Sequence, residues 1–185
     1  MLAPLIFALV PLFFGAKIPP AEPQMTTRHE RPAGAASYGR ERLDSLTGFG
    51  LIKLNGTEVL DLNVKGSLIS KDARTGSFEV SGEANLRDTI VNGRALVIGS
   101  LQASGSTFND LLTICTQKAV FTHTRISNLT IRNEPSYKGK QTLELKQHTI
   151  ISGPIHFESG RGEIIVDSTS QVQGKVTGGK VIYKN

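Results

Sequence analysis

A six-residue hydrophobic period between Phe78 and Ile126 constrains the fold more than any other feature of this sequence. Eight of the nine residues at this spacing are apolar, in a chain that is 38% hydrophobic. They are Phe78, Ala84, Ile90, Leu96, Gln102, Phe108, Ile114, Val120 and Ile126, of which only Gln102 is polar. This spacing fits neither an α-helix, with a period of about 3.6, nor a flat strand, with a period of about two. It favours a solenoid whose short strands turn a corner every few residues.

Apolar pairs two residues apart suggest how the coils of such a solenoid are laid out. Leu60/Leu62, Phe78/Val80 and Leu96/Ile98 recur at 18-residue steps, and Leu112/Ile114 and Leu129/Ile131 follow after 16 and 17 residues. Residues i and i+2 of a strand point to the same face, so both members of a pair can enter one core. Glycine and asparagine between the runs suit tight corners.

The sequence therefore predicts an all-β fold, a single-stranded parallel β-helix with triangular, right-handed coils of about 17–18 residues. The residues expected in its axial core are Phe78, Leu96, Phe108, Ile114 and Ile126. A β-sandwich is the alternative, because regularly spaced short strands are also typical of that fold.

The first 16 residues, MLAPLIFALVPLFFGA, carry no charged side chain. They are short for a transmembrane helix, which needs about 20 residues, and they have the length of the apolar part of a secretory signal. No Lys or Arg precedes them, and Phe14-Gly15-Ala16 is a poor cleavage site. We expect export to the periplasm or cell envelope. The alternative is an uncleaved anchor that holds the protein at the cytoplasmic face of the membrane.

Three further segments complete the predicted organisation. Residues 17–46 are rich in proline and mixed charge, which predicts a disordered spacer. The β-helix domain is expected to span residues 47–185. Within it, the sequence NEPSYKGKQ at 133–141 predicts a loop inserted between coils.

The sequence holds few residues with catalytic or metal-binding potential. Cys115 is the only cysteine, and His123, His148 and His156 lack the cysteine or carboxylate neighbours of a zinc site. The carboxylates that could line one face are Asp61, Glu79, Glu83, Asp88 and Asp110. Paired carboxylates of a glycosidase need a cleft, which a narrow solenoid does not offer. We therefore expect no catalytic residues, no metal site and no cofactor.

Two classes of function lose support from sequence alone. Hexapeptide-repeat acyltransferases share the six-residue period, but none of the residues after the sixth positions is the glycine of their repeats. The formal net charge of +5 is spread along the chain, tryptophan is absent and no RNA-recognition motif occurs, so we do not expect nucleic-acid binding.

The C-terminal coil suggests self-assembly, because no capping helix follows it. Unpaired strand edges are templates for strand addition, although Lys180 and Lys184 could guard this one. We expect homo-oligomers formed by end-to-end stacking. The residues expected at the assembly edges are Val181, Ile182 and Tyr183 at one end, and Phe49 and Leu51 at the other.

Short strands that end in glycine also carry a family resemblance. The stretches are Asn92-Gly93 to Val97-Ile98-Gly99, Ile151-Ser152-Gly153 and Val172-Gln173-Gly174-Lys175-Val176. They resemble bactofilins, bacterial polymer-forming β-helix proteins, between about Gly66 and Gly179. The resemblance implies a β-helix between disordered tails that polymerises end to end without a nucleotide, sometimes with a membrane-targeting N-terminus. The chain departs from this pattern in its irregular coils, its insertion and its export-like N-terminus.

These observations predict a self-assembling structural scaffold of the bacterial cell envelope or cytoskeleton. The alternative is an exported, monomeric β-helix that binds cell-wall polysaccharide or a surface partner along an outer face. A polysaccharide lyase or hydrolase is a further alternative, although the chain shows no cluster of Arg, Lys and Asp.

Overall fold

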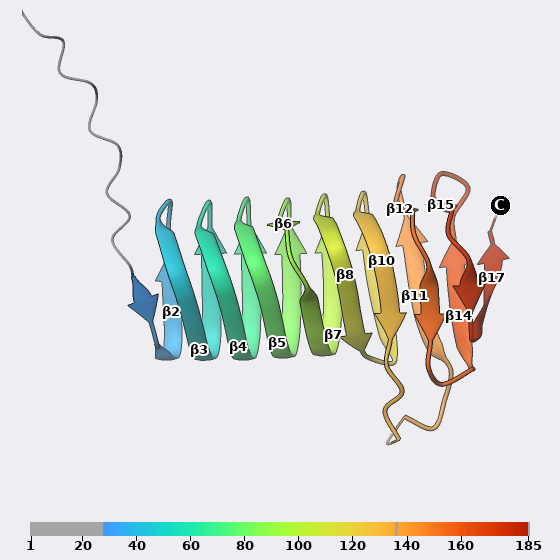
Figure 1. The fold of residues 1–185 in the computed structure, drawn as a ribbon, viewed down its shortest axis with the longest axis horizontal. Coiled ribbons are helices and arrows are strands. Elements are labelled where there is room, and N and C mark those ends of the chain that lie inside the picture. The colour runs from blue at the N-terminus through green and yellow to red at the C-terminus, as the bar shows by residue number, and fades with distance from the viewer. Residues whose placement is uncertain (1–27, 136, 185) are drawn as a thin grey trace, which may run out of the picture.

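The computed structural model describes residues 28–135 and 137–184, which form one parallel β-solenoid of about nine turns. Its coils stack along a single axis, with the N-terminal strands at one end and the C-terminal strands at the other (Figure 1). All strand pairs within one 17-stranded sheet are parallel. The predicted β-helix is confirmed, and a sandwich of antiparallel sheets is excluded. The predicted leader at 1–16 lies outside the described residues.

The longest strands are β3, β4 and β5, and every strand after β5 is shorter. The bounds of the first eight are β1 (His29–Glu30), β2 (Ala33–Tyr38), β3 (Arg42–Asn55), β4 (Glu58–Lys71), β5 (Arg74–Arg87), β6 (Ile90–Val91), β7 (Ala95–Ser104) and β8 (Thr107–Cys115). The other nine are β9 (Lys118–Thr122), β10 (Arg125–Ile131), β11 (Gln141–Lys146), β12 (Ile150–Ile151), β13 (Ile155–Phe157), β14 (Gly162–Val166), β15 (Gln171–Val172), β16 (Val176–Thr177) and β17 (Gly179–Tyr183).

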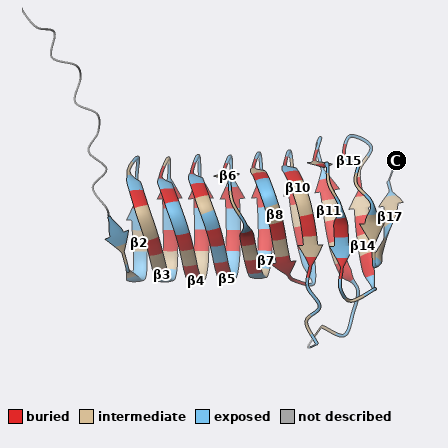
Figure 2. Cartoon of the chain, in the orientation of Figure 1, coloured by how far each residue is buried: buried red, intermediate tan, exposed pale blue. Residues whose placement is uncertain are grey.

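Each coil has three sides, and in the first coils each side points two alternate side chains into the core. In the coil that contains β4, the inward pairs are Thr57/Val59 on the first side, Leu62/Val64 on the second and Leu68/Ser70 on the third. Two or three successive outward residues separate the pairs and form the corners. Buried residues consequently recur along the strands from β3 to β14, whereas the residues of the last three strands are intermediate or exposed (Figure 2).

Register between coils advances by 16 residues in the first coils, by 17 or 18 in the middle and by 17 or 21 in the last coils, with steps of 24 to 26 across the coil that carries the insertion loop. Leu46 pairs with Leu62 and Leu62 with Phe78, and Phe78 then pairs with Ala95. Because neighbouring coils stack side chain on side chain, the inward residues form columns along the axis, most of them apolar. The core is most bulky where Phe78, Phe108, Phe121 and Phe157 are buried.

The alignment of Leu60, Phe78 and Leu96 at 18-residue steps and the core position of Leu96 are wrong. Phe78, Phe108, Ile114 and Ile126 are buried, but Leu96 pairs with Glu79 on the outward row of the second side. Leu60 and Ile98 are also outward, with 47% and 40% of their surface exposed. The physical reason is the corner, where successive outward residues shift the alternation and carry a six-residue count out of phase.

The predicted start of the domain at residue 47 is also wrong. Residues 28–46 belong to the solenoid, because β1 and β2 pair with β3 and Thr47 lies inside β3. The part of the predicted spacer before Arg28 lies outside the described residues. Between β10 and β11 the chain leaves the solenoid as a loop, at the position where the sequence indicates an insertion.

Candidate functional site

The C-terminal coil ends the solenoid with open strand edges. β15, β16 and β17 each pair with the preceding coil only, through β12, β13 and β14. The inward residues of this coil, Val172, Val176 and Val181, are only partly buried against the core. Tyr183 is 64% exposed. Within the described residues, this end therefore presents unpaired backbone groups around an apolar centre.

The structure separates the five predicted assembly residues. Val181, Ile182 and Tyr183 do lie on the terminal strand β17. Phe49 and Leu51 do not lie on an edge, because both belong to β3, which pairs with β2 on one side and β4 on the other. Among the described residues, the N-terminal edge is formed instead by β1 and β2, whose sequences HE and AGAASY give no hydrophobic signal.

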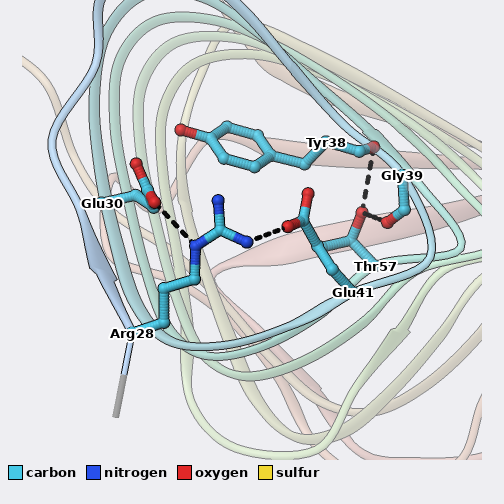
Figure 3. A network of polar contacts seen from close by, with 6 residues as sticks. All are labelled: Arg28, Glu30, Tyr38, Gly39, Glu41 and Thr57. Atoms are coloured by element: carbon cyan, nitrogen blue, oxygen red, sulfur yellow. Dashed lines mark hydrogen bonds and ion pairs between the residues drawn. The ribbon is translucent and has the colours of Figure 1, made fainter. Parts of the chain in front are cut away.

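Charged side chains lie over the core at the N-terminal end. The Nε of Arg28 donates to Glu30 Oε1 at 2.8 Å, and its Nη1 contacts the carboxylate of Glu41 (Figure 3). Hydrogen bonding to Glu30 and the charge of Glu41 raise the pKa of Arg28 above its ordinary value. Tyr38 lies beside this network and is 7% exposed. The N-terminal end is thus polar where the C-terminal end is apolar.

The insertion loop is fastened at its base by a buried glutamine. The Nε2 of Gln141, a residue that is 2% exposed, donates to the carbonyls of Thr116 and Arg132 at 3.1 and 2.8 Å. Its Oε1 accepts a hydrogen bond from Ser159 at 2.8 Å. A buried amide whose donors and acceptor are used in this way holds neighbouring coils in place. The loop base is therefore part of the solenoid.

Cys115 is enclosed beneath this loop. Its Sγ lies 3.8 Å from Glu134 Oε2, and 6% of the residue is exposed. Burial, followed by the negative charge of Glu134, raises the pKa of the thiol. Because the thiolate is the reactive form of cysteine, this position suits a structural thiol.

The histidines and carboxylates singled out by the sequence do not form one site. His123 and His148 stack at adjacent corners with ring centroids 5.4 Å apart, whereas His156 is on the second side and contacts Thr177. The five carboxylates are spread over one side and three corners of different coils. Among residues 28–135 and 137–184, no group of three or more His, Cys, Asp or Glu side chains could hold a metal ion. The same residues include no helix able to cross a membrane.

A groove that the sequence did not predict lies at the corner between the second and third sides of the last three coils. Lys140, Arg161 and Lys180 line it together with glycines, and its volume is about 560 Å³. The available signal was a basic residue just before the third-side strand in two successive coils, Lys140 before β11 and Arg161 before β14.

Comparison of the chain with protein-family models, with curated proteins and with solved structures gives no match. The resemblance to bactofilins is therefore supported for the β-solenoid fold and not for the family.

Proposed function

We propose that this protein is a self-assembling structural protein that stacks end to end through its C-terminal coil. The observation that carries the proposal is the combination of open edges on β15, β16 and β17 with three partly buried valines inside them. In a solenoid each coil is stabilised mainly by its neighbours, so a further coil would complete the backbone pairing and cover the valines. This role needs no catalytic residue and no cofactor.

The register of the coils indicates how a second copy would fit. Ser37 at the N-terminal end and Ile182 at the C-terminal end occupy the same outward position of the third side, related by the pairing of all intervening strands. Stacking in the same sense would place Val181 over Ala36 and Tyr183 over Tyr38. A contact between two C-terminal ends would bring Lys180 and Lys184 of both copies together. We therefore propose a head-to-tail contact.

The resemblance to bactofilins supports a scaffold of the bacterial cell envelope or cytoskeleton, since polymerisation of a β-helix without a nucleotide is what that family does. Placement in the envelope rests on the apolar leader Met1–Ala16. An anchored position on the cytoplasmic face is the alternative placement.

Sedimentation of the full-length protein over a range of concentrations tests the proposal. We expect concentration-dependent oligomers that are weakened by Ile182→Lys, because the added charge lies at the contact. Ile165→Lys is the matched control, because Ile165 is the register partner of Ile182 one coil inside the solenoid, and both are partly buried. A wild-type protein that stays monomeric at high concentration, by sedimentation and electron microscopy, would overturn the proposal.

Cysteine cross-linking tests the direction of stacking. Neighbouring strands lie about 4.8 Å apart, within the Cα separation that a disulfide bridges. A Ser37→Cys, Ile182→Cys double variant should therefore form ladders of cross-linked oligomers, whereas either single variant should not. Dimers formed by Ile182→Cys alone would indicate contact between like ends and contradict the head-to-tail arrangement.

The corner groove favours a second candidate function, a monomeric exported protein that binds an anionic surface component. The sedimentation experiment described above tests this candidate, because a protein that is monomeric at all concentrations would favour it over self-assembly.

A further inference from the structure

The corner groove gathers cationic side chains from three successive coils. Gln141 and Gly162 are register partners on neighbouring coils, and Lys140 and Arg161 immediately precede them. Lys180, one coil further along, is the register partner of Glu163. All three basic residues are exposed. The solenoid thereby aligns charges that are about 20 residues apart in the sequence.

One carboxylate balances part of this charge. Lys140 Nζ lies 3.1 Å from Glu163 Oε2, whose side chain is 16% exposed. Arg161 and Lys180 form no side-chain ion pair within the described part of the chain. The groove consequently carries two positive charges that the protein does not neutralise.

Other lysines on the third side are arranged differently. Glu144 lies between Lys118 and Lys146, with contacts of 2.6 and 2.7 Å, and hydrogen bonding to these two ammonium groups lowers the pKa of the carboxyl. Glu144 thus compensates Lys118 and Lys146, as Glu163 compensates Lys140, whereas Arg161 and Lys180 form no such ion pair among the described residues.

Four glycines line the groove between the basic residues. Gly162 and Gly179 face inward, where an added Cβ would come within 2.1 and 2.7 Å of the ring of Phe157. Gly160 and Gly178 turn the chain with φ of 65° and 70°, and an added Cβ on Gly160 would meet nothing within 4 Å. An oxyanion can therefore approach the backbone at Gly160 without meeting a side chain, next to the three basic residues.

We propose that this groove binds a phosphate group, either as inorganic phosphate or as the phosphate monoester of a sugar. Such a group carries a charge of about −1.5 to −2 at neutral pH, which matches the two uncompensated cations. Arginine donates to phosphate oxygens through a planar fork, and lysine adds a point charge. Protection of an open strand edge against strand addition does not explain the position of Arg161. This residue immediately precedes β14, which already pairs with β11 on one side and β17 on the other.

Titration of the full-length protein by isothermal calorimetry, at low and physiological salt, tests the site. We expect binding of glucose 6-phosphate and of inorganic phosphate, no binding of glucose, and weaker binding at higher salt. Tighter binding of glucose 6-phosphate would assign the site to a phosphorylated sugar, and equal or tighter binding of inorganic phosphate would assign it to the free ion.

Variants locate the binding. Arg161→Gln and Lys180→Gln should each weaken it by about tenfold or more, the usual effect of losing a charged hydrogen bond. Lys175→Gln is the control, because Lys175 is exposed on the same terminal coil but lies outside the groove. Equal losses in all three variants would indicate general surface charge and overturn the proposal, as would the absence of phosphate binding. The Ile182→Lys background should bind equally well, which separates this site from assembly.

Discussion

Buried hydroxyls at one corner show how single residues hold the coils together. Nearly every coil has a threonine or serine just inside the corner between the third and first sides; these are Thr57, Thr89, Ser106, Thr124, Thr149 and Ser170. Thr149 Oγ1, for example, donates to Lys146 O at 2.7 Å and accepts from the backbone N–H of Thr124 at 3.3 Å. These hydroxyls satisfy backbone groups that the corner removes from the strand pairing.

Thr75, at the next inward position of the first side, is a buried hydroxyl without such a partner, and it leads to a prediction. Its Oγ1 is buried and has no hydrogen-bond partner among the described residues, between Val59 and Val91 in the same column. Thr75→Val should raise the free energy of unfolding by about 1 kcal/mol, because it removes an unsatisfied buried polar atom. Urea denaturation measures the change.

Thr89→Val is the matched control for this substitution. Thr89 Oγ1 donates to Arg87 O at 3.0 Å and contacts Ser70 Oγ at 2.9 Å, so its removal leaves buried partners unsatisfied. It should lower the free energy of unfolding by about 1–3 kcal/mol. Equal effects of the two variants would mean that Thr75 is hydrogen-bonded in solution.

Whether a residue points in or out was the part of the fold that sequence could not supply. Inward pairs in the coil of β4 begin at Thr57, Leu62 and Leu68, so their spacing alternates between five and six. A strict count of six finds Phe78 and Ala84, then lands on the outward Ile90 and Leu96, and is back in phase at Phe108. The frequency of apolar residues indicates a solenoid, whereas the length of each corner decides which residues point into the core.

Among the elements, the corner between the second and third sides requires glycine in the first half of the solenoid. Gly34, Gly50, Gly66, Gly82 and Gly99 stack there with φ between 90° and 137°. A Cβ on Gly82 would lie 2.0 Å from the carbonyl oxygen of Gly66. The insertion loop occupies the same corner in a later coil, after this glycine column has ended. The sequence predicts turns at Gly66, Gly82 and Gly99, but it does not show that the glycines lie on one another.

Gly82→Ala should destabilise the protein through both effects. A positive φ costs an L-residue about 1–2 kcal/mol, and the contact with a backbone oxygen adds to that cost. We expect a loss of more than about 2 kcal/mol in the free energy of unfolding by urea denaturation. Gly139→Ala in the insertion loop is the control, because its added Cβ meets nothing within 4 Å. A loss below 0.5 kcal/mol, within the range of ordinary surface substitutions, would show that the column can relax.

At the scale of the whole molecule, the two ends of the solenoid differ in how sequence reveals them. The C-terminal edge is visible because Val181, Ile182 and Tyr183 form an apolar run. The N-terminal coil is hidden because β2 contributes only Ala36 and Tyr38 to the core and follows Pro32. Its composition resembles a disordered spacer, yet β3 offers a paired edge on which it folds. A segment that forms a strand because it pairs with an existing strand is hard to recognise from its own composition.

Truncation tests the role of this N-terminal coil in the whole solenoid. A chain that starts at Thr47 loses β1, β2 and the buried Leu43 and Leu46, and it uncovers Ile52 and Leu54. Its free energy of unfolding should fall by at least about 3 kcal/mol relative to a chain that starts at Arg28, since fully burying one such side chain contributes about 1.5–3 kcal/mol. Urea denaturation of the two truncated proteins measures the difference. Each coil of a solenoid is stabilised mainly by its neighbours. In the chain that starts at Thr47, we therefore also expect faster hydrogen exchange in β3 than in β11. Equal unfolding midpoints for the two chains would mean that residues 28–46 add nothing to the stability of the stack, and that the independent domain begins at the boundary indicated by composition alone.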